Sequence, residues 1–87
     1  MKLKKGYVLH SADGENLMIA TGKAAAEFNG LVRSNATAQF LLEKMQKETT
    51  EEKLTEALLA EYDVDRDTAA RDVHRLVQQL SAEGFLE

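Results

Sequence analysis

Short apolar, β-favouring runs separated by polar and glycine residues mark the first third of the chain. Residues 7–10 and 17–20 favour β-strands, and Asp13-Gly14 between them is a turn pair that tolerates positive φ. These runs predict a β-hairpin. Gly22 interrupts the pattern, and residues 28–33 then resume it, which predicts a third strand.

From Asn35 onward the apolar residues recur at helical spacing. Asn35 is suited to N-capping and precedes a first helix. The apolar stripe of that helix is Ala38, Leu41, Leu42 and Met45. Residues 49–52 have a capping-box pattern and predict a second helix that ends near Asp63. Its stripe is Leu54, Ala57, Leu58 and Tyr62.

The last part of the chain predicts a third helix. Asp65 is a suitable N-cap, and Asp67 is favourable in the first turn because of the helix dipole. The apolar stripe consists of Ala69, Val73, Leu76, Val77 and Leu80. Gly84 is expected to end the helix, which lets Phe85 fold back on the core.

The order of these elements predicts an α+β fold. Three short strands followed by three helices form a small antiparallel sheet that is covered on one face by helices. Three strands cannot close a barrel, so at least one sheet edge stays open. An open edge is either protected by charge or cover, or used to receive another chain as an added strand.

Length and charge narrow the class of protein. The chain has 87 residues and a net charge of −4, which predicts a single domain over residues 1–87 and opposes nonspecific binding to nucleic acid or anionic lipid. No apolar run reaches the length of a membrane span, and no signal-peptide pattern follows the basic start, so we expect a cytoplasmic protein. The absence of cysteine excludes disulfides and thiolate metal sites.

The residue types that catalysis requires are scarce. His10 and His74 are the only histidines, and they fall on different predicted elements. The sequence contains no phosphate-binding loop, dinucleotide fingerprint or zinc-protease motif. Residues 63–67 carry three aspartates, but they lack the glycine and distal glutamate of a calcium loop and fit helix capping better. We therefore expect no enzyme activity, no metal and no cofactor.

Some polar and aromatic positions remain open to two interpretations. The third helix carries a mildly basic stripe of Arg71, His74, Arg75 and Gln78. This stripe is either a binding surface or a solvated face with helix pairing to Asp67 and Asp72. Phe28 and Phe40 are expected in the core, although Phe40 falls off its helix's main stripe and is also a candidate contact for a partner.

Several segments in order resemble the PqqD family, small proteins tied to pyrroloquinoline quinone biosynthesis and to other ribosomally made, modified peptides. The resemblance begins at residues 28–30 (FNG) and 32–38 (VRSNATA). It continues at residues 49–52 (TTEE) and Leu54, and then at residues 61–65 (EYDVD). It closes with Ala70, residues 72–73 (DV) and residues 84–86 (GFL).

The resemblance implies a winged-helix-like RiPP recognition element. In this family the leader segment of a precursor peptide adds as a strand to the third strand and lies against the third helix, and a radical SAM/SPASM enzyme then modifies the peptide. The family member does no chemistry itself. The partners implied are therefore a leader peptide and that enzyme, with no nucleic acid, no membrane and a monomer or weak homodimer.

The expected peptide-binding residues lie on two elements. On the third strand they are Phe28, Asn29, Gly30, Leu31, Val32 and Arg33, and on the third helix they are Arg71, His74, Arg75, Val77 and Gln78. The alternative function is a winged-helix transcription regulator whose third helix enters the major groove. The net negative charge of the chain and the aspartates on the third helix oppose DNA binding.

Overall fold

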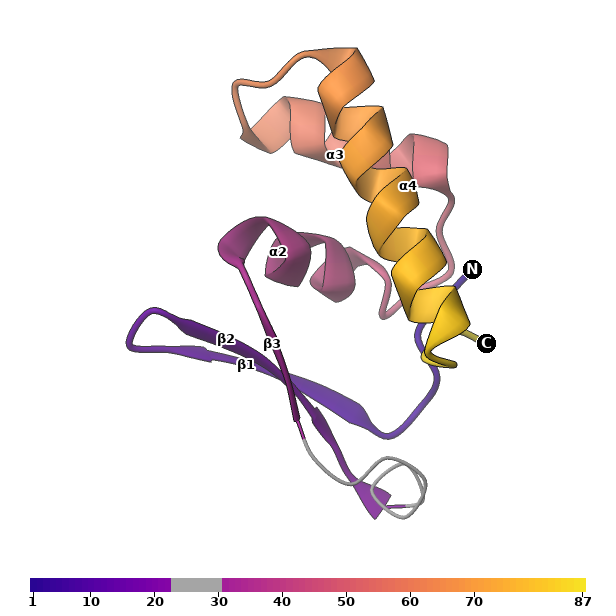
Figure 1. Cartoon of the computed structure of the whole chain (residues 1–87). Helices are drawn as coiled ribbons and strands as arrows, with labels where there is room; N and C mark the ends of the chain where they lie inside the picture. The colour runs from indigo at the N-terminus through magenta and orange to yellow at the C-terminus, as the bar shows by residue number, and fades with distance from the viewer. Residues whose placement is uncertain (23–30) are drawn as a thin grey trace.

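A computed structural model describes residues 1–22 and 31–87 of the chain. Over these ranges the strands are β1 (Tyr7–Ala12), β2 (Glu15–Ala20) and β3 (Leu31–Ser34). The helices that follow are α2 (Ala36–Lys44), α3 (Glu51–Glu61) and α4 (Arg66–Ala82). The helices lie together on one side of the sheet (Figure 1). The predicted α+β, winged-helix-like arrangement is confirmed.

The predicted hairpin is present and its strands are longer than the sequence runs suggested. β1 and β2 pair antiparallel from Tyr7 opposite Ala20 to Ala12 opposite Glu15. Asp13 and Gly14 form the turn with φ of 52° and 79°, the left-handed conformation that a two-residue hairpin turn requires. β3 pairs with β2 on the other side, so the sheet order is β1-β2-β3.

The predicted caps fix the helix starts. The Asn35 side chain accepts a hydrogen bond from the Ala38 amide at 2.7 Å and begins α2. The Thr50 hydroxyl accepts one from the Lys53 amide at 3.1 Å and begins α3. Asp65 occupies the N-cap position of α4 but forms no side-chain capping hydrogen bond. Gly84, with φ of 81°, follows the C-cap of that helix.

The hydrophobic core lies mainly between the helices. Its buried members are Leu3, Met18, Leu41, Leu42, Met45, Leu54, Leu58, Ala69, Val73, Leu80 and Phe85. Phe85 is 1% exposed, and its ring meets Tyr7 edge-on at 5.2 Å, so the predicted return of the C-terminal segment to the core is confirmed.

One polar side chain joins the first helix to the sheet. Gln39 is buried, and its amide nitrogen lies 3.2 Å from the carbonyl oxygen of His10 and 3.3 Å from that of Leu17. The Ser34 hydroxyl donates to the Gln39 carbonyl oxygen at 3.1 Å. This side chain therefore links α2 to all three strands.

The first residues of the chain lie between two other segments, which the sequence did not predict. The Leu3 amide donates to the carbonyl of Met45 at 2.9 Å, and the Lys4 amide donates to that of Phe85 at 2.9 Å. Leu3 and Leu86 also form an antiparallel bridge. The two ends of the chain accordingly lie side by side (Figure 1).

One predicted boundary differs from the structure, and another falls partly outside the described residues. α3 ends at Glu61 rather than near Asp63, and Tyr62 is its extended C-cap with 38% of its surface exposed, so Tyr62 does not belong to the buried stripe. The described part of the third strand begins at Leu31, and the predicted strand positions 28–30 lie outside the described residues.

Candidate functional site

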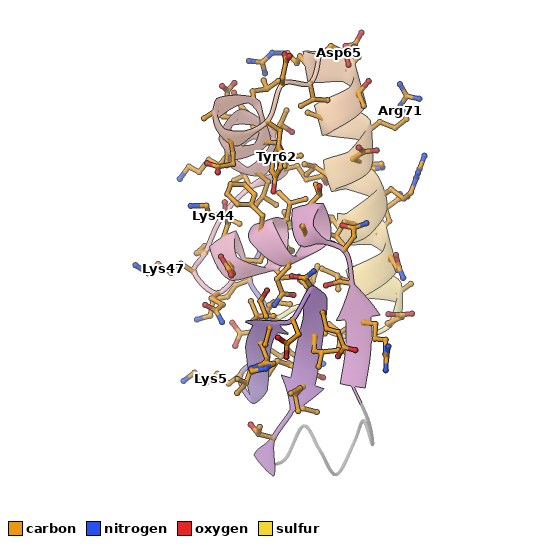
Figure 2. The ribbon with its side chains drawn as sticks, turned by 90° about the vertical axis from the view of Figure 1, so that its left-hand side faces the viewer. Lys5, Lys44, Lys47, Tyr62, Asp65 and Arg71 are labelled. Carbon is orange, nitrogen blue, oxygen red and sulfur yellow. The ribbon has the colours of Figure 1, made fainter. Side chains whose placement is uncertain are left out.

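The free side of β3 is the first component of the candidate site. β3 pairs through Leu31 to Ser34 with β2, and no strand among residues 1–22 and 31–87 pairs with its other side. In Figure 2, β3 is the outermost strand on the side of the molecule where α4 runs. The backbone groups on this side can therefore bond to an added strand.

An open cavity of about 320 Å³ lies between the start of α2 and the middle of α4. The residues that line it are Asn35, Thr37, Ala38, Leu41, Asp72, Arg75, Leu76 and Gln79. Because Asn35 follows directly on β3, the cavity begins where the strand ends. The free edge and the cavity thus form one continuous candidate site.

The cavity has an apolar floor and a charged flank. Leu41 is buried and Leu76 is half-buried, and they supply the apolar contact surface. Asp72 and Arg75 are exposed, and neither forms an ion pair with any residue in the described ranges. A ligand can therefore meet a carboxylate or a guanidinium that has no ionic partner among the described residues.

The structure separates the residues that the sequence grouped on the third helix. Of Arg71, His74, Arg75, Val77 and Gln78, Arg75 alone lines the cavity. His74 lies on the other flank, where its Nδ1 is 2.9 Å from Oε1 of Glu51 in α3. Val77 is half-buried against the core, and Arg71 and Gln78 are exposed.

The strand positions are only partly described. Residues 28–30 lie outside the described residues. The backbones of Leu31 and Val32 pair with Ile19 and Met18 of β2. Arg33 pairs with Leu17, and its exposed guanidinium lies 3.9 Å from the Glu15 carboxylate on β2.

The charged side chains at the start of α4 interact with other residues of the chain. The Thr68 hydroxyl lowers the pKa of the Asp65 carboxyl below its usual value, and the charge of Arg71 adds a smaller effect in the same direction. Arg66 binds Glu56 of α3 at 2.7 Å. This end of α4 is therefore occupied by contacts within the helical layer.

Sequence reasoning missed Asp72, Leu76 and Gln79 as candidate site residues. A helical projection offers two flanks beside the apolar stripe of α4, and both contain polar residues. The contact of His74 with α3 shows which flank is taken by that helix, leaving the opposite flank for the cavity. Only the packing of the helices distinguishes the two.

Within the described ranges, His, Asp and Glu side chains do not gather in groups of three that would suit a metal ion. No helix of those ranges is long and apolar enough to cross a bilayer.

A sequence model for the family described as "Coenzyme PQQ synthesis protein D (PqqD)" matches residues 7–86. The chain belongs to the PqqD family. The match runs from β1 through Leu86 and so includes β3, α4 and the cavity between them. No curated protein matches this PqqD-family chain in sequence.

Two solved structures share the fold of this PqqD-family chain. One is "TbiB1 in Complex with the TbiA(beta) Leader Peptide", with a TM-score of 0.77 and 23% identity over 100% of this chain and 95% of that one. The other is "Lasso peptide synthetase B1 complexed with the leader peptide", with a TM-score of 0.71 and 20% identity over 95% of this chain and 92% of that one. Both neighbours are complexes with leader peptides.

Proposed function

We propose that this chain binds the leader segment of a ribosomally synthesised precursor peptide by strand addition. The observation that carries the proposal is the free edge of β3 beside the cavity bordered by α4. Membership of the PqqD family and the likeness to two leader-peptide complexes support it. In this proposal the peptide backbone bonds to β3 while its side chains enter the cavity.

The residues that line the cavity indicate which leader side chains it can bind. Main-chain bonds to an edge strand depend little on sequence, so recognition of a particular leader requires side-chain contacts. An apolar leader side chain fits over Leu41 and Leu76, and an acidic leader group fits beside Arg75. Ordering a flexible leader costs several kcal/mol of the contact energy, so we expect micromolar to sub-micromolar affinity.

The chain is proposed to act as an adaptor rather than as an enzyme. It presents the bound leader to a radical SAM/SPASM enzyme, which carries out the chemistry on the rest of the peptide. The exposed Asp72 and Arg75 line the cavity, where they suit side-chain contacts with a peptide.

Titration with a synthetic leader peptide, taken from any short precursor gene found beside the gene for this chain, tests the proposal. We expect the largest NMR shifts at Leu31 to Ser34 and on the α4 flank at Asp72, Arg75, Leu76 and Gln79. The β3 amides that face the free edge are expected to gain protection from hydrogen exchange. A leader with one N-methylated residue in the added strand is the matched control, because it keeps the side chains and loses a backbone donor.

Two results would refute strand addition. One is leader binding that leaves β3 unshifted. The other is equal affinity for every N-methylated leader as the methyl group is moved along the segment. Binding at the outer edge of β1 would appear instead as shifts over Tyr7–Ala12.

A further inference from the structure

Several exposed lysines of the described residues lie on one side of the molecule, away from the candidate site. We define the lysine face as Lys4, Lys5, Lys44 and Lys47, all of which are exposed. In Figure 2, Lys5, Lys44 and Lys47 extend to one side, while β3 and Arg71 lie on the other. A positive surface in a chain of net charge −4 is a local feature that composition does not require.

The backbone brings these lysines together from two distant segments. The hydrogen bond from the Leu3 amide to the Met45 carbonyl places the start of the chain beside the end of α2. The hollow at this junction measures about 260 Å³. Its lining residues are Lys2, Leu3, Lys4, Lys5, Tyr7 and Gln46. Because both flanking segments are hydrogen-bonded to the body of the protein, the hollow is part of the fold.

The charges of the lysine face have no acidic partner in the described part of the chain. Lys2 binds Glu87 at 3.6 Å, whereas no ion pair joins any of the four lysines of the face to a described residue. Carboxylates from outside the molecule can therefore pair with these ammonium groups.

An aromatic pair adjoins the lysine face at α2. The ammonium group of Lys44 lies 5.2 Å from the centroid of the Phe40 ring, and that ring meets Tyr62 edge-on at 5.7 Å. Tyr62 is the more exposed of the two rings. Aromatic residues are enriched at protein interfaces, whereas the net negative charge of the chain disfavours binding to nucleic acid and anionic lipid.

We propose that the lysine face binds an acidic surface of the modifying enzyme. This inference rests on the proposed function and adds to it the surface that meets the enzyme. Since the face lies on the side opposite to β3 in Figure 2, leader and enzyme can bind at the same time. The lysines provide electrostatic steering and Phe40 with Tyr62 provides apolar contact.

The test compares two double variants of equal net charge. Lys5→Glu with Lys47→Glu reverses the face, and Lys53→Glu with Arg66→Glu reverses two exposed cations on α3 and α4. Each variant is titrated separately with a radical SAM enzyme whose gene is found beside the gene for this chain, and with the synthetic leader, at 0.15 M salt. We expect the face variant to bind the enzyme about tenfold more weakly or worse, and the control within about twofold of wild type. Both are expected to bind the leader within about twofold of wild type.

The acidic chemistry of the partner is tested by NMR with small probes. Hexaglutamate is expected to shift the amides of residues 4–5 and 46–47, and inorganic phosphate is not, because one small anion cannot span both segments. Equal amide shifts with phosphate and hexaglutamate would indicate a simple anion site. Tighter binding of the protein to duplex DNA or to phosphatidylserine vesicles than to the enzyme would indicate that the lysine face binds one of these polyanions instead. Either result overturns the proposal.

Failure of this inference is distinguishable from failure of the proposed function. The lysine-face inference alone is overturned if the wild-type protein binds the leader but does not bind the enzyme. It is also overturned if the wild-type protein binds the leader and Lys5→Glu with Lys47→Glu leaves enzyme binding unchanged. An equal loss in both double variants overturns it as well, because net charge then explains the effect. Lysine-dependent enzyme binding with no leader binding overturns the leader proposal and leaves the face in place.

Discussion

The helical layer and the sheet of this protein are packed to different degrees. The helices supply most of the buried apolar side chains, including Leu54, Leu58 and Val73. Among the strand residues whose side chains are described, Met18 is the one buried apolar residue. Val8 on β1 is 50% exposed. Stability therefore resides mainly in the helices and the two chain ends, whereas the described part of the sheet keeps a free edge at β3.

The largest effect is expected from emptying the core at the C-terminal segment. Phe85→Ala removes a fully buried ring that packs on Tyr7, so we expect a loss of about 3–5 kcal/mol in the free energy of unfolding. Val8→Ala in the exposed sheet is the matched control and is expected to change stability by less than about 0.5 kcal/mol. Urea unfolding measures both. Similar losses in the two variants would contradict the division between core and sheet.

The sequence predicted the elements of the helical layer well because each has a local signal. Asn35 and Thr50 are caps whose bonds form within three residues, and the stripe through Ala69 and Val73 follows from helical spacing alone. The Asp13-Gly14 turn likewise fixes the hairpin register. Local chemistry was enough for these parts of the fold.

Contacts between segments far apart in the sequence could not be predicted in this way. The bond from Leu3 to Met45 and that from Gln39 to His10 depend on how the elements dock. The choice between Arg71 and Arg75 as a cavity residue depends on the rotation of α4 about its own axis. Single-sequence periodicity leaves that rotation open between two polar flanks. The candidate site was therefore predicted by element and only partly by residue.

An intermediate effect is expected where the two regions are joined. Gln39→Leu removes a buried amide that bonds to carbonyl groups of His10 and Leu17 and to the Ser34 hydroxyl, so we expect a loss of about 1–3 kcal/mol. Gln78→Leu changes an exposed glutamine on α4 in the same way and is expected to have little effect. Urea unfolding gives the size of the loss, and hydrogen exchange shows whether the amides of β2 lose more protection than those of α3. Uniform loss in both would indicate that Gln39 stabilises the whole fold rather than the junction.

A smaller effect, confined to binding, is expected at the cavity. Arg75→Glu places a carboxylate where an acidic leader group is proposed to bind, and we expect leader affinity to fall about tenfold with unchanged stability. Arg71→Glu makes the same charge change outside the cavity lining and is expected to alter affinity less than about threefold. Calorimetric titration of both variants measures this difference. Equal losses would place the leader along the exposed face of α4 that the sequence first suggested.

The smallest effect concerns the acid stability of the helical layer. The Thr68 hydroxyl holds the pKa of Asp65 below its usual value in the folded protein, so the folded state favours the ionised carboxylate. A carboxyl whose pKa is lowered by folding stabilises the folded state at pH values above its pKa in the unfolded chain, which is about 3.9 for aspartate. This contribution is lost as the pH falls through the pKa of the carboxyl in the folded protein. Asp65→Asn removes the titrating group. We expect the gap between the urea midpoints of wild type and variant to narrow as pH falls below about 4. A gap that widens on acidification would mean that the carboxylate opposes folding, and that α4 begins without help from its N-cap charge.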